Sequence, residues 1–304
     1  MPAADAQGDA GEIWVLDDGR PGHRNQSLAL AEALQRHRAG LRLRELAAAP
    51  AAAAFMALLL RAPAPAAPPR LLIGAGHGTH AGLLAWRHRI GCPAVVLMRP
   101  GLPSRLFDLV IEPRHDGGRE SARRWLSDGP LTRLRPGRER GEPGLILVGG
   151  PSPHFHWDEA ALLRQLAQVC DGSGEWLLST SRRTPVGFLE RLRALRIPGL
   201  SAAAAPALGD GWLAAQLPCT AHCWVTPDSA SMVYEALSAG CALGVLELRP
   251  RRRSRVAAGL RHLQARGLCT GFAAWEQGAP LQAPPRPLAE ADRLAARILE
   301  RGLL

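Results

Sequence analysis

The sequence contains no lysine, so all 37 of its permanently basic side chains are arginine. This absence excludes lysine Schiff-base chemistry, the Gly-Lys-Ser/Thr phosphate loop and the kinase-type lysine. Arginine instead offers a planar fork that binds phosphate or carboxylate in a bidentate manner. The 27 acidic residues leave a formal net charge of +10, which favours anionic ligands.

Aromatic residues make up 5% of the chain, with one tyrosine, and no nucleic-acid-binding module is recognisable. Recognition of nucleic acid usually combines basic residues with aromatic side chains on which bases stack. We therefore expect no nucleic-acid partner, and we interpret the arginine run at residues 251–253 as solvated charge.

A long hydrophobic run is also missing. The longest apolar stretch, residues 46–60, is interrupted by Pro50 and falls short of the roughly 18 residues of a membrane span. Residues 1–12 lack the basic start and apolar core of a secretory signal. We expect a cytoplasmic protein. Residues 51–61 leave two alternatives open, a core segment or an interfacial helix that attaches the protein peripherally to the inner face of the membrane.

Six cysteines are scattered along the chain, which is typical of reduced thiols and not of a disulfide framework. Cys219, His222 and Cys223 imitate metal ligands, but no second pair follows at zinc-site spacing. No two aspartates stand two residues apart, and no Gly-x-Gly-x-x-Gly follows the first expected strand. We therefore expect no metal and no cofactor, and neither a nicotinamide enzyme nor an epimerase that needs that cofactor.

The 304 residues, 47% of them hydrophobic, suffice for two globular domains. Short apolar runs alternate with segments of helical periodicity, which indicates an α/β fold with parallel, doubly wound sheets. The expected strands are residues 13–16, 71–73, 94–98, 109–111, 145–148, 176–178, 224–226 and 244–246. The expected helices are residues 25–35, 79–88, 158–170, 185–195, 229–238 and 287–300.

Residues 114–143 are polar and rich in glycine and proline, so we place a domain boundary near residue 140. The chain then divides into residues 1–140, residues 141–286 and a C-terminal helix, residues 287–304. No strand follows that helix, which could therefore cross back over the domains. In doubly wound sheets ligands bind at the carboxyl ends of the strands, so the loops at those ends contain the candidate sites.

The segment from Thr226 to Ala236 joins a strand directly to a helix. Asp228 or Ser229 can cap that helix, and its amino end can then bind a phosphate. Glu235 lies a little under two turns further on, where a carboxylate can accept two ribose hydroxyl protons. An ordinary capped helix with a surface glutamate is the alternative.

Two further loops are candidates for contacts with a diphosphate. Ser181, Arg182 and Arg183 directly follow a strand, where hydroxyls and a guanidinium can hold phosphate. Adjacent arginines point in different directions, so we expect at most one to contact the ligand, and a solvated basic turn is the alternative. Gly150 and Ser152 lie in a Gly-Gly-Pro-Ser turn, where glycine permits close backbone approach.

Residues 17–26 form the most polar loop of the chain. His23 can act as a general base toward an acceptor hydroxyl, with Asp18 as reserve base or as the residue that orients it. A helix cap is the alternative role for His23. His77 is a second candidate for the general base, with a structural role as the alternative. The acceptor-side residues that we single out are Arg20, Asn25, Gln26, Gly76 and His77.

Several strings occur in an order that identifies a family. They are Asp17-Asp18-Gly19-Arg20-Pro21-Gly22-His23-Arg24-Asn25-Gln26, Ile73-Gly74-Ala75-Gly76, Phe107-Asp108-Leu109-Val110, Gly149-Gly150-Pro151-Ser152, Thr180-Ser181-Arg182-Arg183-Thr184-Pro185 and Val225-Thr226-Pro227-Asp228-Ser229-Ala230-Ser231-Met232. The chain resembles bacterial members of the mitochondrial-fission elongated-mitochondria family over residues 13–268. That family is regarded as a group of glycosyltransferases of the GT-B fold.

The resemblance implies two facing Rossmann-like domains, with acceptor bound to the first and nucleotide-sugar donor to the second. The segment from Asp228 to Glu235 is also similar in layout to the donor site of the peptidoglycan lipid-linked N-acetylglucosaminyltransferase. By that likeness Ser229, Ser231, Met232 and Glu235 contact the donor. The implied substrates are a nucleoside-diphosphate sugar and an acceptor hydroxyl, with a lipid-linked acceptor as one alternative. A non-catalytic interaction or membrane-associated protein of the same fold is the competing hypothesis.

Overall fold

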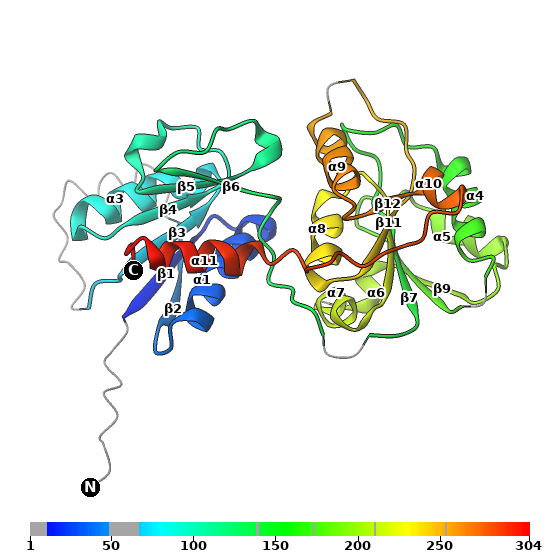
Figure 1. Cartoon of the computed structure of the whole chain (residues 1–304), viewed down its shortest axis with the longest axis horizontal. Coiled ribbons are helices and arrows are strands. Elements are labelled where there is room, and N and C mark those ends of the chain that lie inside the picture. The colour runs from blue at the N-terminus through cyan, green and yellow to red at the C-terminus, as the bar shows by residue number, and fades with distance from the viewer. Residues whose placement is uncertain (1–10, 49–66, 138–139, 173, 210, 253) are drawn as a thin grey trace, which may run out of the picture. The chain divides into compact units, whose positions relative to one another are not determined.

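Figure 1 shows the computed structural model of the chain, which describes residues 11–48, 67–137, 140–172, 174–209, 211–252 and 254–304. Residues 51–61, the candidate interfacial helix, lie outside the described residues. Within the described part, no helix combines the length and the hydropathy that crossing a bilayer requires.

The chain divides into two compact units, one made of Met1–Arg133 with Ala289–Leu304 and one of Leu134–Leu288. The first is called unit 1 and the second unit 2. The division falls a few residues before the expected boundary at residue 140, because Leu134 already packs against the core of unit 2. The C-terminal helix is part of unit 1 and does not form a separate body.

Unit 1 contains a six-stranded parallel sheet in the order β2-β1-β3-β4-β5-β6. The strands are β1 (Glu12–Asp17), β2 (Arg42–Ala47), β3 (Leu71–Ala75), β4 (Ala94–Leu97), β5 (Leu109–Pro113) and β6 (Arg124–Ser127). The helices are α1 (Pro21–His37), α3 (His80–Ile90) and α11 (Glu290–Glu300), with short 3-10 turns η1 (His77–Thr79), η2 (Ser104–Leu106) and η3 (Arg114–Asp116). Because β3, β4 and β5 are buried along their whole length, helices or loops cover both faces of the sheet there.

Helix α11 completes the core of unit 1. Its apolar stripe includes Leu294 and Ile298, both fully buried in the cluster that also contains residues of α1 and β1. At its solvent edge the Arg36 guanidinium of α1 lies 2.9 Å from an Asp292 carboxylate oxygen. The chain therefore returns from unit 2 to finish the first unit, as the figure shows in red against blue (Figure 1).

Unit 2 contains a second six-stranded parallel sheet, in the order β12-β11-β10-β7-β8-β9. Its strands are β7 (Gly144–Leu147), β8 (Trp176–Ser179), β9 (Leu200–Ala203), β10 (His222–Val225), β11 (Ala242–Val245) and β12 (Thr270–Gly271). Its helices are α4 (Glu159–Val169), α5 (Phe188–Ala194), α6 (Ala205–Leu208), α7 (Trp212–Gln216), α8 (Ala230–Ala239), α9 (Arg255–Ala265) and α10 (Phe272–Glu276), with the turn η4 (Leu217–Cys219). This order is the doubly wound arrangement that the alternating pattern predicts.

Substitution of a buried residue of α11 tests its place in the core. Leu294→Ala removes a fully buried side chain, so we expect the free energy of unfolding to fall by about 2 to 4 kcal/mol in urea denaturation. Glu300→Ala, on the exposed side of the same helix, is the matched control and is expected to change it by less than about 0.5 kcal/mol. Equal losses for the two variants would contradict this packing.

Candidate functional site

In unit 1 the winding reverses direction between β1 and β3, and ligands of doubly wound sheets bind outside the strand ends at that switch point. Asp18 follows the last residue of β1, and Gly76 follows the last residue of β3. The loops that contain the predicted acceptor-side residues therefore meet at the place where the topology favours ligand binding.

His23 lies in helix α1 and not in the loop where the sequence analysis placed it. The helix begins at Pro21, because proline suits the first helical position and its missing N–H leaves no unsatisfied donor there. Asn25 and Gln26 also lie in α1, and the Gln26 amide donates to the Gly22 carbonyl oxygen at 3.3 Å. Arg20, just before the helix, and Asn25 are exposed.

The His23 ring is held by a carboxylate on one side and by backbone on the other. Its Nδ1 lies 2.8 Å from Asp18 Oδ2, and since a carboxylate accepts, Nδ1 is the donor of this hydrogen bond. In the neutral ring this arrangement leaves the lone pair on Nε2. The other oxygen of Asp18 accepts from the Arg20 N–H at 3.2 Å. A Cβ on Gly76 would stand 2.2 Å from His23 Cε1, so the ring packs directly on the Gly76 backbone. The carboxylate and the glycine backbone therefore fix the orientation of the His23 ring.

The His77 side chain forms no hydrogen bond or ion pair with this pair in the described structure, although its neighbours Gly76 and Gly78 pack against His23 and Asp18. The His77 side chain is exposed, packs on Gly101, and its ring centroid is 5.2 Å from that of His80. His80 is buried, and burial together with the charge of His77 lowers its pKa. His77 lies at the strand end named for the acceptor side, but it has no contact with His23 in the described part of the chain.

In unit 2 the winding reverses between β7 and β10. The loop after β7 carries Gly149 and Gly150, and the loop after β10 carries Thr226 and Asp228. The Gly149 N–H donates to Thr226 Oγ1 at 2.7 Å, and the Gly150 N–H donates to Asp228 Oδ2 at 2.9 Å. The two loops are therefore joined at the switch point.

Asp228 connects a third loop to these two. Its Oδ2 also lies 2.8 Å from the Arg183 guanidinium, which donates to the carbonyl oxygens of Gly150 and Pro151 as well. The Asp228 side chain is 1% exposed, and its Oδ1 lies against Gly149 with no hydrogen-bond partner in the described structure. Asp228 thus positions the loops through Oδ2 and leaves one buried acceptor unused at the switch point.

Sequence reasoning did not identify Thr184 and Thr226, two threonines that hold this framework. The Thr184 hydroxyl donates to backbone carbonyl oxygens of the β7 loop and accepts from the Ser181 N–H at 2.9 Å. Thr226 accepts from Gly149, as described above. Their position, one to five residues after a strand in a polar loop, is the signal that was available.

The predicted helix cap is wrong. No side chain caps α8, because Asp228 turns toward Gly150 and Arg183 and the Ser229 hydroxyl lies 3.4 Å from that of Ser231. By contrast, Asp158 caps α4 and Ser254 caps α9. The amino end of α8 therefore keeps backbone donors that no capping side chain of its own satisfies, together with the positive end of the helix dipole.

The other predicted donor residues lie around that helix end with differing exposure. Ser231 is exposed, Ser229 is buried, and Met232 packs partly into the core of unit 2. Arg182 is exposed and makes no interaction with the described residues, unlike Arg183. Ser152 accepts from the His154 N–H at 3.2 Å.

Glu235 stands one turn of helix after Ser231, on the same side of α8. Its side chain is half-buried and has neither a hydrogen bond nor an ion pair in the described structure. Burial without a partner raises its pKa to about 7. A half-buried carboxyl group with a raised pKa and no partner, beside an uncapped helix end, is more typical of a ligand site than of a purely structural helix.

The fold and the two switch points define a protein of the GT-B class, with two Rossmann-like α/β units. Solved structures that share this fold include MurG of Acinetobacter baumannii (16% identity, TM-score 0.50, covering 97% of this chain and 92% of that one). They also include the glycotransferase of kitacinnamycin (15% identity, TM-score 0.56, covering 97% of this chain and 99% of that one). A third is the UDP-GlcNAc 2-epimerase of Neisseria meningitidis bound to UDP-GlcNAc (10% identity, TM-score 0.56, covering 96% of this chain and 99% of that one). At these identities the similarity shows the fold.

The family follows from the sequence. The model of the family described as Mitochondrial fission ELM1 matches residues 21–302, so the chain belongs to that family. The resemblance seen in the sequence motifs is thereby confirmed. A comparison with curated protein sequences gives no match.

Gly76→Ala tests whether the glycine is required by the His23 ring. Gly76 has a φ of +77° and a ψ of 167°, a conformation that costs an alanine about 1 to 3 kcal/mol. The overlap with the ring adds to that cost, so we expect a total loss of at least about 3 kcal/mol in unfolding free energy. Gly209→Ala is the matched control, since Gly209 has nearly the same backbone angles, φ +79° and ψ 165°, with open space around it, and should lose only the conformational part of the unfolding free energy. Equal losses in urea denaturation would show that the ring does not constrain this position.

Glu235 predicts a pH-dependent stability. Its pKa is raised from 4.5 to about 7 in the folded protein, so the folded state binds more protons than the unfolded state between these values and stability falls as pH rises through that window. Glu235→Gln removes this effect. We expect its unfolding free energy, relative to the parent, to be higher at pH 8 than at pH 5 by about 2 to 3 kcal/mol. The same difference at both pH values would contradict the raised pKa.

Proposed function

We propose that the protein transfers a sugar from a nucleoside-diphosphate sugar to an acceptor hydroxyl. The observation that carries the proposal is the uncapped amino end of α8 at the switch point of unit 2, with the unpaired carboxyl of Glu235 one turn beyond Ser231. The proposal assigns the donor to unit 2 and the acceptor to unit 1.

On the donor side, the backbone N–H groups at the start of α8 bind the diphosphate. Arg183 is already held by Asp228 and two carbonyl oxygens, so the exposed Arg182 is the arginine available to neutralise the leaving group. Glu235, once ionised, accepts hydrogen bonds from the two ribose hydroxyls. Preorganised donors of this kind contribute about 3 to 4 kcal/mol each to transition-state stabilisation.

On the acceptor side, His23 is the general base. Its Nε2 removes the proton of the acceptor hydroxyl while Asp18 holds the Nδ1–H and stabilises the imidazolium that forms. The acceptor oxygen forms a bond to the anomeric carbon, the bond from that carbon to the diphosphate oxygen breaks, and the electron pair leaves with the nucleoside diphosphate. The structural neighbour bound to UDP-GlcNAc supports a nucleotide-sugar ligand for this fold.

Two alternatives share the fold. A non-catalytic protein would keep the same scaffold without turnover. The second alternative is an epimerase. The missing nicotinamide fingerprint does not separate the two enzyme classes by fold, because a UDP-GlcNAc 2-epimerase has a similar structure. The ordered His23–Asp18 pair in unit 1 favours transfer, since it supplies a base for a second substrate.

Calorimetric titration with the diphosphates of uridine, guanosine, thymidine and cytidine tests the donor site. We expect one of them to bind, Glu235→Gln to weaken that binding at least tenfold, and the affinity of the parent to rise with pH through about 7 as Glu235 ionises. Glu190→Gln, an exposed glutamate of α5, serves as the control and should leave binding unchanged. Absence of binding by all four nucleotides would overturn the proposal.

His23→Gln tests the base. With the nucleotide that binds, the corresponding sugar donor should be consumed slowly by hydrolysis or transfer, and the variant should lower the rate about 10²- to 10⁴-fold while leaving nucleotide affinity unchanged. Asp18→Asn should reduce the rate less, because the ring remains but loses its orienting carboxylate. A parent protein that binds nucleotide sugar with no turnover would favour the non-catalytic alternative. Conversion of the sugar into its epimer, with the sugar still attached to the nucleotide, would favour an epimerase.

A further inference from the structure

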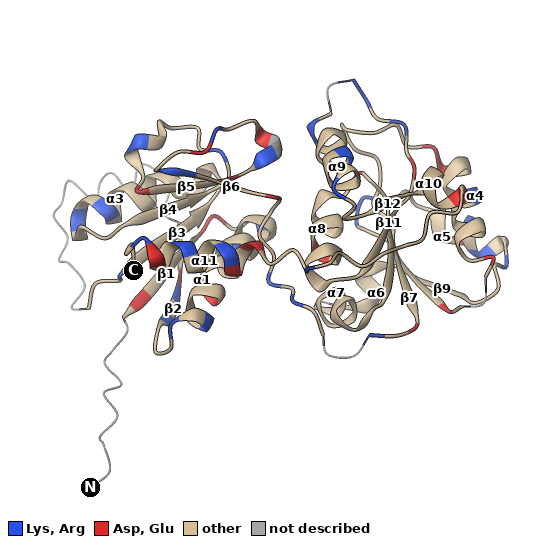
Figure 2. Cartoon of the chain, in the orientation of Figure 1, with Lys and Arg blue, Asp and Glu red and all other residues tan. Residues whose placement is uncertain are grey.

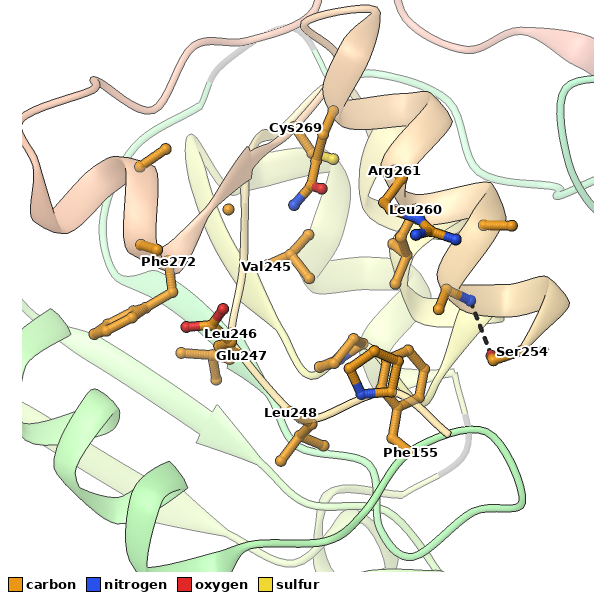
Figure 3. A pocket seen from close by; sticks show the side chains of 18 of the residues that line it. Phe155, Val245, Leu246, Glu247, Leu248, Ser254, Leu260, Arg261, Cys269 and Phe272 are labelled. Atoms are coloured by element: carbon orange, nitrogen blue, oxygen red, sulfur yellow. Dashed lines mark hydrogen bonds between the residues drawn. The ribbon is translucent and has the colours of Figure 1, made fainter. Parts of the chain in front are cut away.

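A pocket of about 970 Å³ lies within unit 2, between α9 on one side and β12 with the start of α10 on the other (Figure 3). Its apolar lining comes from the ends of β11, from α9, from α10 and from the loop after β7: Phe155, Val245, Leu246, Leu248, Leu260 and Phe272. This volume is at the upper end of what small-molecule sites have.

Arginine dominates the charge around this lining. Arg251, Arg252, Arg255 and Arg261 line the pocket, against one carboxylate, Glu247. Arg252 and Arg261 are exposed and have no hydrogen bond or ion pair with the described residues, while Arg251 donates to the Phe155 carbonyl oxygen at 3.3 Å. Figure 2 shows this positive charge on α9 and on the loop before it.

The pocket is distinct from the donor site proposed above. Pro227 lines it, so it borders the loop after β10, but Ser231 and Glu235 do not contribute to it, nor do the residues of the β7 and β8 loops that join at the switch point. The pocket therefore borders the donor site proposed above but shares none of the residues assigned to it.

We propose that this pocket binds an amphipathic anion, an alkyl or prenyl chain that ends in a phosphate or carboxylate. The apolar lining gains affinity by removing chain methylenes from water, roughly fourfold for each that is fully buried. The guanidinium groups at the rim bind the anionic head, for which arginine has the matching geometry. The neutral polar side chains of the lining are Ser254, Gln264 and Thr270, and two of their hydroxyls are already engaged, that of Ser254 by the Ala257 N–H and that of Thr270 by the Pro280 carbonyl oxygen. The charge that remains around the lining is mainly guanidinium, which favours an anionic head over a neutral sugar.

Binding of octyl phosphate, measured by calorimetry below its micelle-forming concentration, tests the proposal. Inorganic phosphate supplies the head without the chain, and octyl glucoside supplies the chain with a neutral head. We expect octyl phosphate to bind at least tenfold more tightly than either. Equal affinity for octyl phosphate and inorganic phosphate would overturn the apolar contribution, and equal affinity for the two octyl compounds would overturn the role of the arginines.

Variants locate the binding in this pocket. The double variant Arg252→Gln with Arg261→Gln should weaken octyl phosphate binding about tenfold or more, and Ala258→Trp, an exposed residue of α9 that lines the pocket, should block it without disturbing the core. Arg249→Gln removes the same charge from the same loop outside the lining and is the control, with less than a twofold change expected. Unchanged binding in all of these variants would overturn the assignment.

Two further measurements separate this site from the donor site and identify the source of the anion. The tightest-binding nucleoside diphosphate should not displace octyl phosphate, and Glu235→Gln should bind octyl phosphate normally; displacement would overturn the separate site while leaving glycosyl transfer intact. Flotation with phosphatidylcholine vesicles that contain phosphatidic acid, but not with pure phosphatidylcholine, would assign a membrane lipid. Binding of octyl phosphate without flotation would assign a free amphiphile.

Discussion

The carboxylate of Asp228 is the interaction on which the arrangement of unit 2 depends. One of its oxygens receives both the Gly150 N–H and the Arg183 guanidinium, and so links the loops that follow β7, β8 and β10. Because this carboxylate is turned into the framework, it does not cap α8. The bond that orders the loops thereby leaves the amino end of the helix available to an anion. The N-cap residue itself, Ser229, has its hydroxyl 3.4 Å from that of Ser231 and does not cap the helix either.

Unit 1 uses a comparable device with a different outcome. There the carboxylate that follows a central strand, Asp18, orders a histidine instead of an arginine, and a glycine lies under the histidine ring, whereas in unit 2 a glycine lies under the carboxylate itself. In both units the glycine is needed because a Cβ would occupy the space of the side chain above it: the His23 ring over Gly76, and the Asp228 carboxylate over Gly149. The two switch points thus combine a fixed charge with close backbone approach, and differ in whether the ordered group is a base or a cation.

The central strands of both sheets could be predicted from the sequence, whereas the four edge strands could not. β1, β3, β4 and β5 of unit 1, and β7, β8, β10 and β11 of unit 2, are largely buried and were visible as short apolar runs. The unrecognised strands, β2, β6, β9 and β12, all lie at sheet edges. An edge strand such as β2 is exposed to solvent along much of its length and contains charged residues, so it shows no apolar run. Its charged residues are Arg42, Arg44 and Glu45.

The candidate site was predictable at the level of loops and not at the level of bonds. Polar residues directly after central strands identified the segments, because parallel sheets bring strand ends to one edge. Which partner each side chain takes depends on distances across loops far apart in the chain. For this reason the pairing of Asp228 with Gly150 and Arg183, about 78 and 45 residues away, replaced the local cap that sequence spacing favoured.

The unpaired carboxyl of Glu235 lowers the stability of the folded protein at high pH. A carboxyl that is half-buried without a partner stays protonated to about pH 7, so at higher pH the chain must either pay desolvation of a charge or find a donor for it. Natural helices rarely keep such a group on their inner side unless a ligand supplies the missing hydrogen bonds. Arg182 is in the complementary condition, an exposed cation with no partner among the described residues. The nucleoside-diphosphate donor proposed above supplies both missing partners, ribose hydroxyls for the carboxyl of Glu235 and phosphate charge for the guanidinium of Arg182.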